Sequence, residues 1–96
     1  LFSEYQVKSN PESGYGRADV LLIPRQKGKP GVALEFKVAK KGEQLESALE
    51  KALKQLKDKE YDTLLKEQGA YPIYQYGAAF SGKYVLVQLL AESSVS

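Results

Sequence analysis

The chain has 96 residues, of which 43% are hydrophobic and 27% charged, and its formal net charge is +2. This length is enough for one small domain, residues 1–96, with a single core. The absence of cysteine excludes a disulfide framework, and the absence of histidine excludes an imidazole base, so any chemistry rests on carboxylates, lysines, tyrosines or a metal held by oxygen.

The N-terminal half predicts three short strands. Residues 4–8, EYQVK, form a brief first strand, and the turn-rich stretch SNPESGYG at 9–16 predicts a hairpin connection. Residues 18–24, ADVLLIP, are an apolar run that Pro24 ends, and a polar loop leads from there into VALEFKV at 32–38. We expect the second and third strands to be antiparallel neighbours.

A helical period begins at Glu43 and runs to about Lys59, with one apolar stripe. The stripe comprises Leu45, Ala48, Leu49, Ala52, Leu53 and Leu56. Residues 61–69, YDTLLKEQG, predict a second, shorter helix with Gly69 as its stop signal.

The C-terminal part returns to strands. Residues 71–80 and 83–90 are two strand-like runs joined by a short turn around Gly82. The closing AESSVS at 91–96 predicts a polar tail. Strands, helix and strands in one small chain predict an α/β fold of the α+β mixed-sheet type, with the helix across one face. A crossover helix would make the strands at 32–38 and 73–80 parallel, with a right-handed connection.

The strand GVALEFKV, residues 31–38, carries Glu35 and Lys37 in an otherwise apolar run. Because side chains alternate along a strand, Leu34, Phe36 and Val38 share one face, which we expect to pack, while the acid and the lysine are presented on the other. Alternation of this kind is also typical of any half-solvated strand, so this motif alone favours the structural interpretation.

The preceding strand strengthens the functional interpretation. Asp19 is in phase with Leu21 and Ile23, at the start of a strand that is otherwise too apolar to hold a carboxylate, although a lone Asp there is more often a turn or cap residue. If the two strands are neighbours, Asp19, Glu35 and Lys37 converge. Two close carboxylates repel unless a cation neutralises them, and a hard divalent cation with oxygen ligands does so without His or Cys.

An Asp at the start of one strand, followed on the next by acid, apolar residue and lysine, resembles the signature of the PD-(D/E)XK nuclease superfamily. More closely, SNPESGYGRADVLLIP, ALEFKV, ALEKALKQL and YGAAFSGKYVLV are similar to the nuclease-like domain that follows an AAA-ATPase-like region in many bacterial proteins. The resemblance extends from about Tyr5 to Val87. It departs from the family pattern at Ala18, where the superfamily has proline, and the helix that usually precedes the first strand is absent or reduced to LFSEY.

The resemblance implies a restriction-endonuclease-like core with a metal-dependent site for hydrolysis of DNA. Magnesium or manganese would be held by Asp19, Glu35 and the backbone carbonyl of Phe36, and Lys37 would be the catalytic lysine. The family often places a helical glutamine near the site, here Gln55. The associated pattern of glutamine, three residues and tyrosine is not met, because Lys59 stands at the tyrosine position.

Other residues are accessory candidates. Glu12 could be a further acidic ligand, although a turn carboxylate is more often solvated. Arg17 could clamp a phosphate with two hydrogen bonds or form a surface ion pair with Glu12 or Glu35. Lys83, in the turn SGK, is a candidate contact to the DNA backbone, and it equally suits a solvated hairpin turn.

The predicted helix also carries a row of lysines. Lys51, Lys54, Lys57 and Lys59 alternate with Glu46, Glu50, Asp58 and Glu60. This pattern is typical of a solvent-exposed helix with local ion pairs, so we do not interpret it as a nucleic-acid surface. The net charge of +2 is likewise too small to predict nucleic-acid binding.

Two functions of different classes follow from the sequence. One is a metal-dependent DNA nuclease domain, and the other is a non-catalytic module of the same fold that binds an ATPase domain, nucleic acid or a second copy of itself. An exposed sheet edge would be covered naturally in a homodimer. The absence of a long apolar run or a signal peptide predicts a soluble, cytoplasmic protein without a membrane span.

Overall fold

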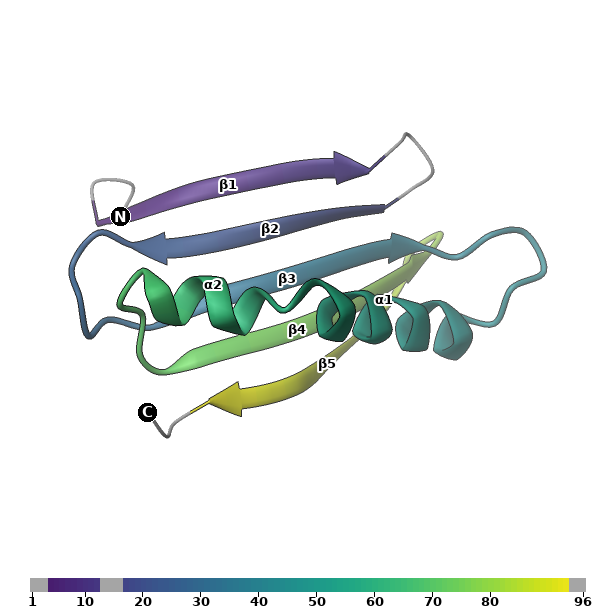
Figure 1. Cartoon of the computed structure of the whole chain (residues 1–96). Helices are drawn as coiled ribbons and strands as arrows, with labels where there is room; N and C mark the ends of the chain where they lie inside the picture. The colour runs from purple at the N-terminus through teal and green to yellow at the C-terminus, as the bar shows by residue number, and fades with distance from the viewer. Residues whose placement is uncertain (1–3, 13–16, 94–96) are drawn as a thin grey trace.

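The computed structural model describes residues 4–12 and 17–93, with side chains for 4–10 and 18–90. These residues form a five-stranded sheet and two helices (Figure 1). In chain order the elements are β1 (Tyr5–Glu12), β2 (Arg17–Pro24), β3 (Gly31–Val38), α1 (Leu45–Lys59), α2 (Tyr61–Glu67), β4 (Ile73–Ser81) and β5 (Tyr84–Ser93).

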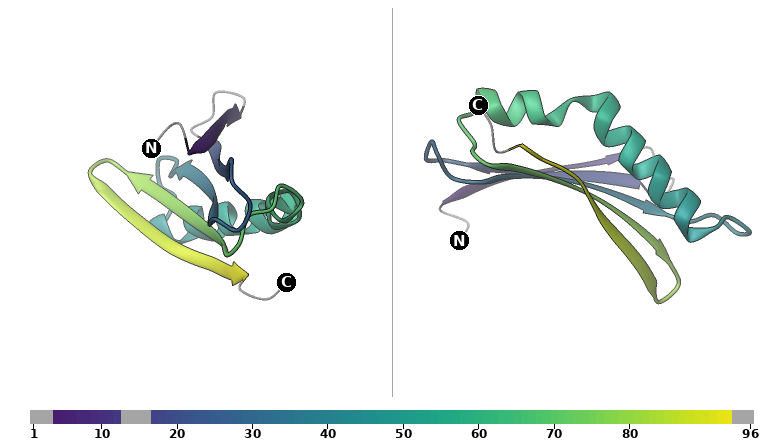
Figure 2. Two further views of the ribbon diagram at one scale, coloured as in Figure 1. Left: turned by 90° about the vertical axis from the view of Figure 1, so that its left-hand side faces the viewer. Right: turned by 90° about the horizontal axis from the view of Figure 1, so that it is seen from below.

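The strands lie in the sheet in the same order as in the chain, β1-β2-β3-β4-β5. All neighbours are antiparallel except β3 and β4, which are parallel and are connected through α1 and α2. Both helices lie on one side of the sheet and leave its other side uncovered in the described residues (Figure 2). The mixed sheet with helix across one face agrees with the prediction from the sequence.

The first hairpin differs from the prediction, because β1 continues through residues expected in the turn. Asn10 pairs with Asp19 and Pro11 with Ala18, and the strand ends at Glu12. Proline is tolerated at this point because β1 is an edge strand, where one side of the backbone needs no partner for hydrogen bonding. Residues 13–16 of the expected turn lie outside the described residues.

The expectation that the apolar face of β3 packs is wrong. Gly31, Ala33, Glu35 and Lys37 are the buried residues of this strand, and they face α1 and α2. The alternate face is half-buried and ends at Val38, whose residue surface is 49% exposed. Helices can approach a sheet closely only over small side chains, so Gly31 and Ala33 mark the covered face better than the larger apolar residues do.

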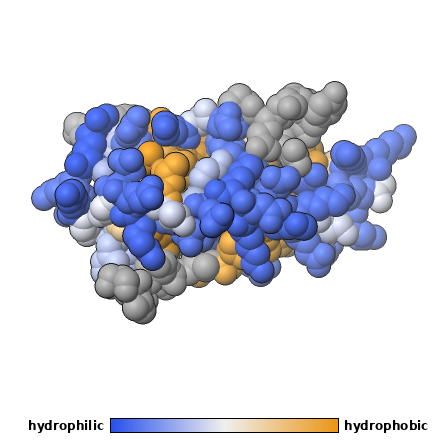
Figure 3. Space-filling model, viewed as in Figure 1, coloured by the Kyte–Doolittle hydropathy of each residue, from blue (hydrophilic) through white to orange (hydrophobic). Residues whose placement is uncertain are grey.

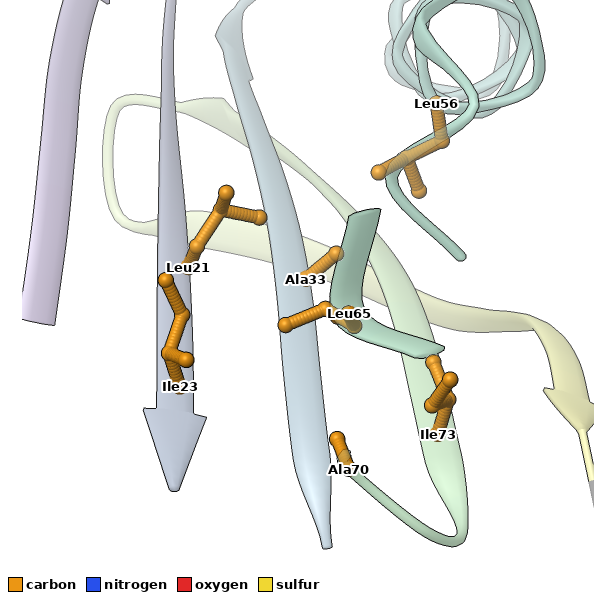
Figure 4. Close-up of a cluster of buried hydrophobic side chains, with 7 residues drawn as sticks. All are labelled: Leu21, Ile23, Ala33, Leu56, Leu65, Ala70 and Ile73. Atoms are coloured by element: carbon orange, nitrogen blue, oxygen red, sulfur yellow. The ribbon is translucent and has the colours of Figure 1, made fainter. Parts of the chain in front are cut away.

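The core lies between the sheet and the helices. Its main cluster comprises Leu21, Ile23, Ala33, Leu56, Leu65, Ala70 and Ile73, drawn in Figure 4. A second cluster joins Ala48 and Leu49, in the first half of α1, to Ala79 of β4. Leu56 and Leu65 are completely buried, and each contributes about 2 kcal/mol through removal of its side chain from water.

Gly77 lets α1 lie close to the middle of the sheet. An added Cβ at this position would come within 2.8 Å of Cδ2 of Leu53, a contact that ordinary packing does not allow. Gly77 also pairs directly with Glu35 of β3. The close approach therefore occurs where the acid of the EFK motif faces the helix.

Strand β5 extends past the expected start of the polar tail. It continues to Ser93, which pairs with Ile73, and Glu92 pairs with Tyr74. Backbone hydrogen bonds to β4 extend the strand, because backbone groups can pair whether or not the side chains are apolar. The polar sequence after Leu90 therefore does not end β5. An irregularity in the ladder between Gln75 and Tyr76 lets β5 shift register near this end.

The helix-covered side of the molecule is mainly hydrophilic, with apolar atoms visible only in narrow patches (Figure 3). The charged residues of α1 account for much of this surface, because most of them are exposed. Among the described residues, neither helix combines the length and the apolar character that a membrane crossing requires.

The side of the sheet away from the helices, here called the open sheet face, has a different composition. The strand register places only uncharged residues there among the described side chains. Several large apolar residues on it are well exposed, with Val85 at 50%, Val87 at 61% and Leu89 at 43%. Contiguous apolar surface of this kind is unusual on a monomer and is typical of an interaction surface.

Candidate functional site

The two acids of the predicted site lie side by side on the helix-covered face. Asp19 of β2 and Glu35 of β3 are directly opposite each other in the antiparallel register. Both are nearly inaccessible, with 2% and 1% of their surface exposed. The structure therefore brings together the carboxylates that the sequence predicts to converge, and it does so inside the protein.

Lys37 lies two residues beyond Glu35 on the same face, and its surface is only 6% exposed. The pKa of Glu43, in the loop before α1, is lowered chiefly by hydrogen bonds from Lys51 and from the backbone of Lys40, and the charge of Lys37 lowers it further. A buried lysine is retained in a folded protein when its charge is compensated, and Glu43 is one carboxylate that the charge of Lys37 reaches.

The junction of α1 and α2 completes the site from above the sheet. Glu60, between the helices, has the left-handed backbone conformation, with φ 53° and ψ 45°. This conformation is uncommon for a residue with a side chain and ends α1. It places two flanking residues, Lys59 and Tyr61, over Asp19.

Lys59 contacts both acids. Its Nζ atom donates to Oδ2 of Asp19 at 2.8 Å and lies 3.4 Å from Oε1 of Glu35. The prediction of a fully solvent-exposed lysine face is therefore wrong for this residue, whose side chain is 21% exposed. The prediction is confirmed for Lys54, which forms an exposed i,i+4 pair with Asp58 at 3.0 Å.

Tyr61 donates its hydroxyl hydrogen to the same Oδ2 atom of Asp19. Burial and this hydrogen bond raise the pKa of the Tyr61 hydroxyl well above its usual value, because both disfavour the phenolate. The proton therefore stays on Tyr61 at neutral pH and fixes the orientation of the carboxylate. Sequence reasoning missed Tyr61, which the sequence shows only as the first residue of the second predicted helix.

The donor set is compatible with a divalent cation. Two carboxylates point into one position from adjacent strands, and a cationic group, the ammonium of Lys59, already contacts both. Hard divalent cations prefer such oxygen ligands. Within the part of the chain that the structure describes, no group of three or more acidic, histidine or cysteine side chains gathers in one place, so a third ligand from these residues would be a backbone carbonyl.

A solvent-filled groove of about 570 Å³ reaches the site from the side of β1. It is lined by residues of β1, β2 and α2, including Lys8, Asn10, Asp19 and Tyr61. Asp19 is therefore buried by its neighbours yet borders a space into which a ligand can extend.

The accessory candidates Glu12, Arg17 and Gln55 lie on the strands and the helix that surround the acids. Glu12 and Arg17 end β1 and begin β2, paired with each other, and Arg17 also pairs with Lys37. Their side chains lie outside the described residues, so their roles stay predictions. Gln55 is half-buried on α1, one turn before Lys59 and on the same side of the helix.

Lys83 does not lie at the site. It is exposed in the turn between β4 and β5, while Glu35 is opposite Gly77, four residues before the end of β4. At about 3.3 Å for each residue, this separation places Lys83 more than about 13 Å along the sheet from the acids. Its predicted contact with nucleic acid would have to be made at the end of the sheet.

The sequence is similar to one known family over most of its length. The sequence model of one family, described as the PD-(D/E)XK nuclease superfamily, matches residues 1–88. Neither the curated proteins nor the solved structures contain a significant match to the chain.

Proposed function

Because the chain belongs to the PD-(D/E)XK nuclease superfamily, we propose that it is a metal-dependent nuclease domain that hydrolyses DNA phosphodiester bonds. The proposal rests mainly on one observation. Asp19 and Glu35 are opposite each other on adjacent strands, buried, and share their face with Lys37.

In this proposal Asp19, Glu35 and the backbone carbonyl of Phe36 hold Mg²⁺ or Mn²⁺. When bound, the metal supplies an activated water and charge stabilisation at the phosphate. Lys37 orients the attacking water and offsets the negative charge that develops on the phosphate oxygens. Tyr61 keeps Asp19 in one orientation through its hydrogen bond.

The groove beside Asp19 offers a route for the phosphate backbone. Lys8 lies along it, so a cation is already present where a nucleic acid would pass. Arg17 is proposed as a further phosphate contact, and Lys83 as a contact with DNA at the far end of the sheet. In a longer bacterial protein, an AAA-ATPase-like region is the proposed partner domain, in the cytoplasm.

The test of this function combines metal binding with cleavage. Titration calorimetry with Mg²⁺ and Mn²⁺ is compared for the unchanged chain and the double variant Asp19→Asn, Glu35→Gln, which keeps the shape of both side chains. The same samples are then incubated with linear, single-stranded and branched DNA. We expect the double variant to lose metal binding and cleavage, and Lys37→Ala to lose cleavage while it still binds metal.

Lys54→Ala is the matched control, because Lys54 is an exposed lysine of α1 whose ion pair with Asp58 lies away from the acids. It should leave both metal binding and cleavage unchanged. A folded, unchanged chain that neither binds a divalent metal nor cuts any of these DNAs would show that the nuclease function is wrong.

The open sheet face favours a second function, as an interaction module. We propose a second copy of the chain as its occupant. Five strands about 4.8 Å apart and eight residues at about 3.3 Å each make a face of roughly 600 Å². Two such faces packed together bury roughly 1,200 Å², the lower limit of a standard stable interface, and no described charge on the face would be desolvated.

A further inference from the structure

We propose that Lys59 is an internal counter-ion of Asp19 and Glu35 that lies where these acids would hold a divalent cation and must leave that position when the cation binds. The inference rests on the proposed metal-dependent function. It assigns to Lys59 a role different from that of Lys37, because the two lysines reach the acids from different elements, α1 and β3.

The contacts of Lys59 are those of a bound cation. Nζ is 2.8 Å from an oxygen of Asp19 and 3.4 Å from an oxygen of Glu35, and these acids are 2% and 1% exposed at their side chains. An ion that bridges two carboxylates from neighbouring strands lies where their negative potential is strongest. The ammonium and a divalent metal would therefore compete for one position.

The backbone is arranged to place Lys59 there. In a continuous α-helix, residues two apart point in directions that differ by about 200°. The left-handed conformation of Glu60 interrupts the helix, so that Lys59 and Tyr61 both reach the same oxygen, Oδ2 of Asp19. One side chain supplies a charge and the other a neutral hydroxyl, and only the charge opposes a metal.

Repulsion between like charges favours an exchange. The ammonium of Lys59 contacts both Asp19 and Glu35, so these two carboxylates already have a positive counter-charge. A divalent cation at the same oxygens would lie beside this ammonium, and two positive charges held close together in a buried place repel strongly. Withdrawal of Lys59 removes this repulsion and frees the oxygens for the metal.

Lys59 is built for such a withdrawal. It is the last residue of α1, its stem has four flexible carbons, and its side chain is 21% exposed, so part of the side chain already reaches the surface. Lys37, the penultimate residue of β3, is buried by comparison, with only 6% of its surface exposed. The exchange therefore involves Lys59 and leaves Lys37 in place for catalysis.

The first test measures Mg²⁺ affinity by calorimetry for Lys59→Met, which keeps the length of the side chain without its charge. We expect at least about tenfold tighter Mg²⁺ binding than in the unchanged chain, and a larger rise in melting temperature at saturating Mg²⁺. Lys54→Met, on the exposed face of the same helix, should leave the affinity unchanged. Equal or weaker Mg²⁺ binding by Lys59→Met would overturn the inference.

The second test uses the unchanged chain, so it does not depend on the folding of a variant. Lysines are reductively methylated with and without saturating Mg²⁺, and the modified peptides are quantified by mass spectrometry. Lys59 should react more slowly than Lys54 in the absence of metal and several-fold faster in its presence, with Lys54 unchanged. A rate at Lys59 that stays constant while Mg²⁺ binds would also overturn the inference.

The failure of this inference can be distinguished from failure of the proposed function. If the unchanged chain binds Mg²⁺ and cuts DNA but Lys59→Met binds no more tightly, the nuclease function stands and the role of Lys59 is wrong. If neither protein binds Mg²⁺ and neither cuts DNA, both proposals are wrong.

Discussion

Nζ of Lys59 lies 2.8 Å from Oδ2 of Asp19, although 40 positions separate the two residues in the chain. This contact joins the end of α1 to the start of β2 across the strand that carries Glu35. The site is therefore assembled from three parts, β2, β3 and the α1–α2 junction. Changes at the junction should consequently be felt at the acids.

Replacement of Tyr61 by Phe tests how strongly the junction holds Asp19. The variant keeps the ring but removes the hydroxyl that donates to the buried carboxylate. Because hydrogen bonds to charged groups are the stronger ones, we expect a loss of about 1.5 to 3 kcal/mol in the free energy of unfolding, measured by urea denaturation. Tyr84→Phe, at a residue that is 66% exposed, should change the stability little. Equal stability of Tyr61→Phe and the unchanged chain would contradict the contact.

Replacement of Gly77 by Ala tests the close approach of α1 to the sheet. The added methyl group would meet Leu53 at 2.8 Å, so the helix must move or the side chain must change rotamer. We expect a loss of about 1 to 3 kcal/mol in unfolding free energy from this overpacking. The measurement is chemical denaturation followed by circular dichroism.

A double-mutant cycle separates this clash from other effects of the change at Gly77. In a Leu53→Ala background the opposing side chain is truncated, so Gly77→Ala should cost clearly less than it does alone. Additive losses in the double variant would show that Leu53 does not determine the cost.

Glu43 provides a pH-dependent test in the loop before α1. Its carboxylate accepts hydrogen bonds from Nζ of Lys51 at 2.6 Å and from the backbone N–H of Lys40 at 2.9 Å, and these bonds lower its pKa. A lowered pKa in the folded state stabilises the fold above the ordinary pKa of about 4.5, and this stabilisation is lost as the pH falls through the folded value.

Glu43→Gln should therefore melt at a lower temperature than the unchanged chain at pH 7, and the difference should shrink as the pH falls below the ordinary pKa of about 4.5 and through the lower, folded value. Melting curves across this range make the comparison. Glu50→Gln, at an exposed residue of α1, is the control and should show a smaller difference. A difference for Glu43→Gln that persists unchanged at low pH would contradict the assignment.

The open sheet face predicts self-association. Val87, 61% exposed and on this face, pairs with Ala78, whereas the adjacent Gln88 pairs with Gly77 and points to the helix side. A lysine at Val87 would place a charge in the proposed interface, so Val87→Lys should shift a dimer to monomer in analytical ultracentrifugation, and Gln88→Lys should not. A monomeric unchanged chain would exclude the second copy as occupant of this face.

Part of the fold and of the site could be predicted from local patterns. The alternation in GVALEFKV and the apolar run before Pro24 predicted two neighbouring antiparallel strands, and the register places Asp19 opposite Glu35 as that pairing requires. The stripe from Leu45 to Leu56 predicted α1, because a period of 3.6 residues is visible within a single helix.

Other features depended on contacts between distant residues. The alternation in the sequence predicted the wrong face of β3 to be covered, since both faces carry residues that can be buried, and the small residues Gly31 and Ala33 pack on the side of the helices. Lys59 matched the pattern of an exposed helix lysine because its neighbours in the chain are charged. Those neighbours give no information about its contact with Asp19, which is 40 positions away in the chain.

The sequence by itself determined the elements, the pairing of β2 with β3 and the presence of two acids and a lysine on neighbouring strands, because these follow from periodicities of two and 3.6 residues. Only the tertiary structure decided that the face with Asp19 and Glu35 is the buried one. It also decided that the helix is interrupted at Glu60, and that Lys59 and Tyr61 contact Asp19. The physical reason is that burial and charge compensation are properties of the packed chain, set by residues tens of positions apart.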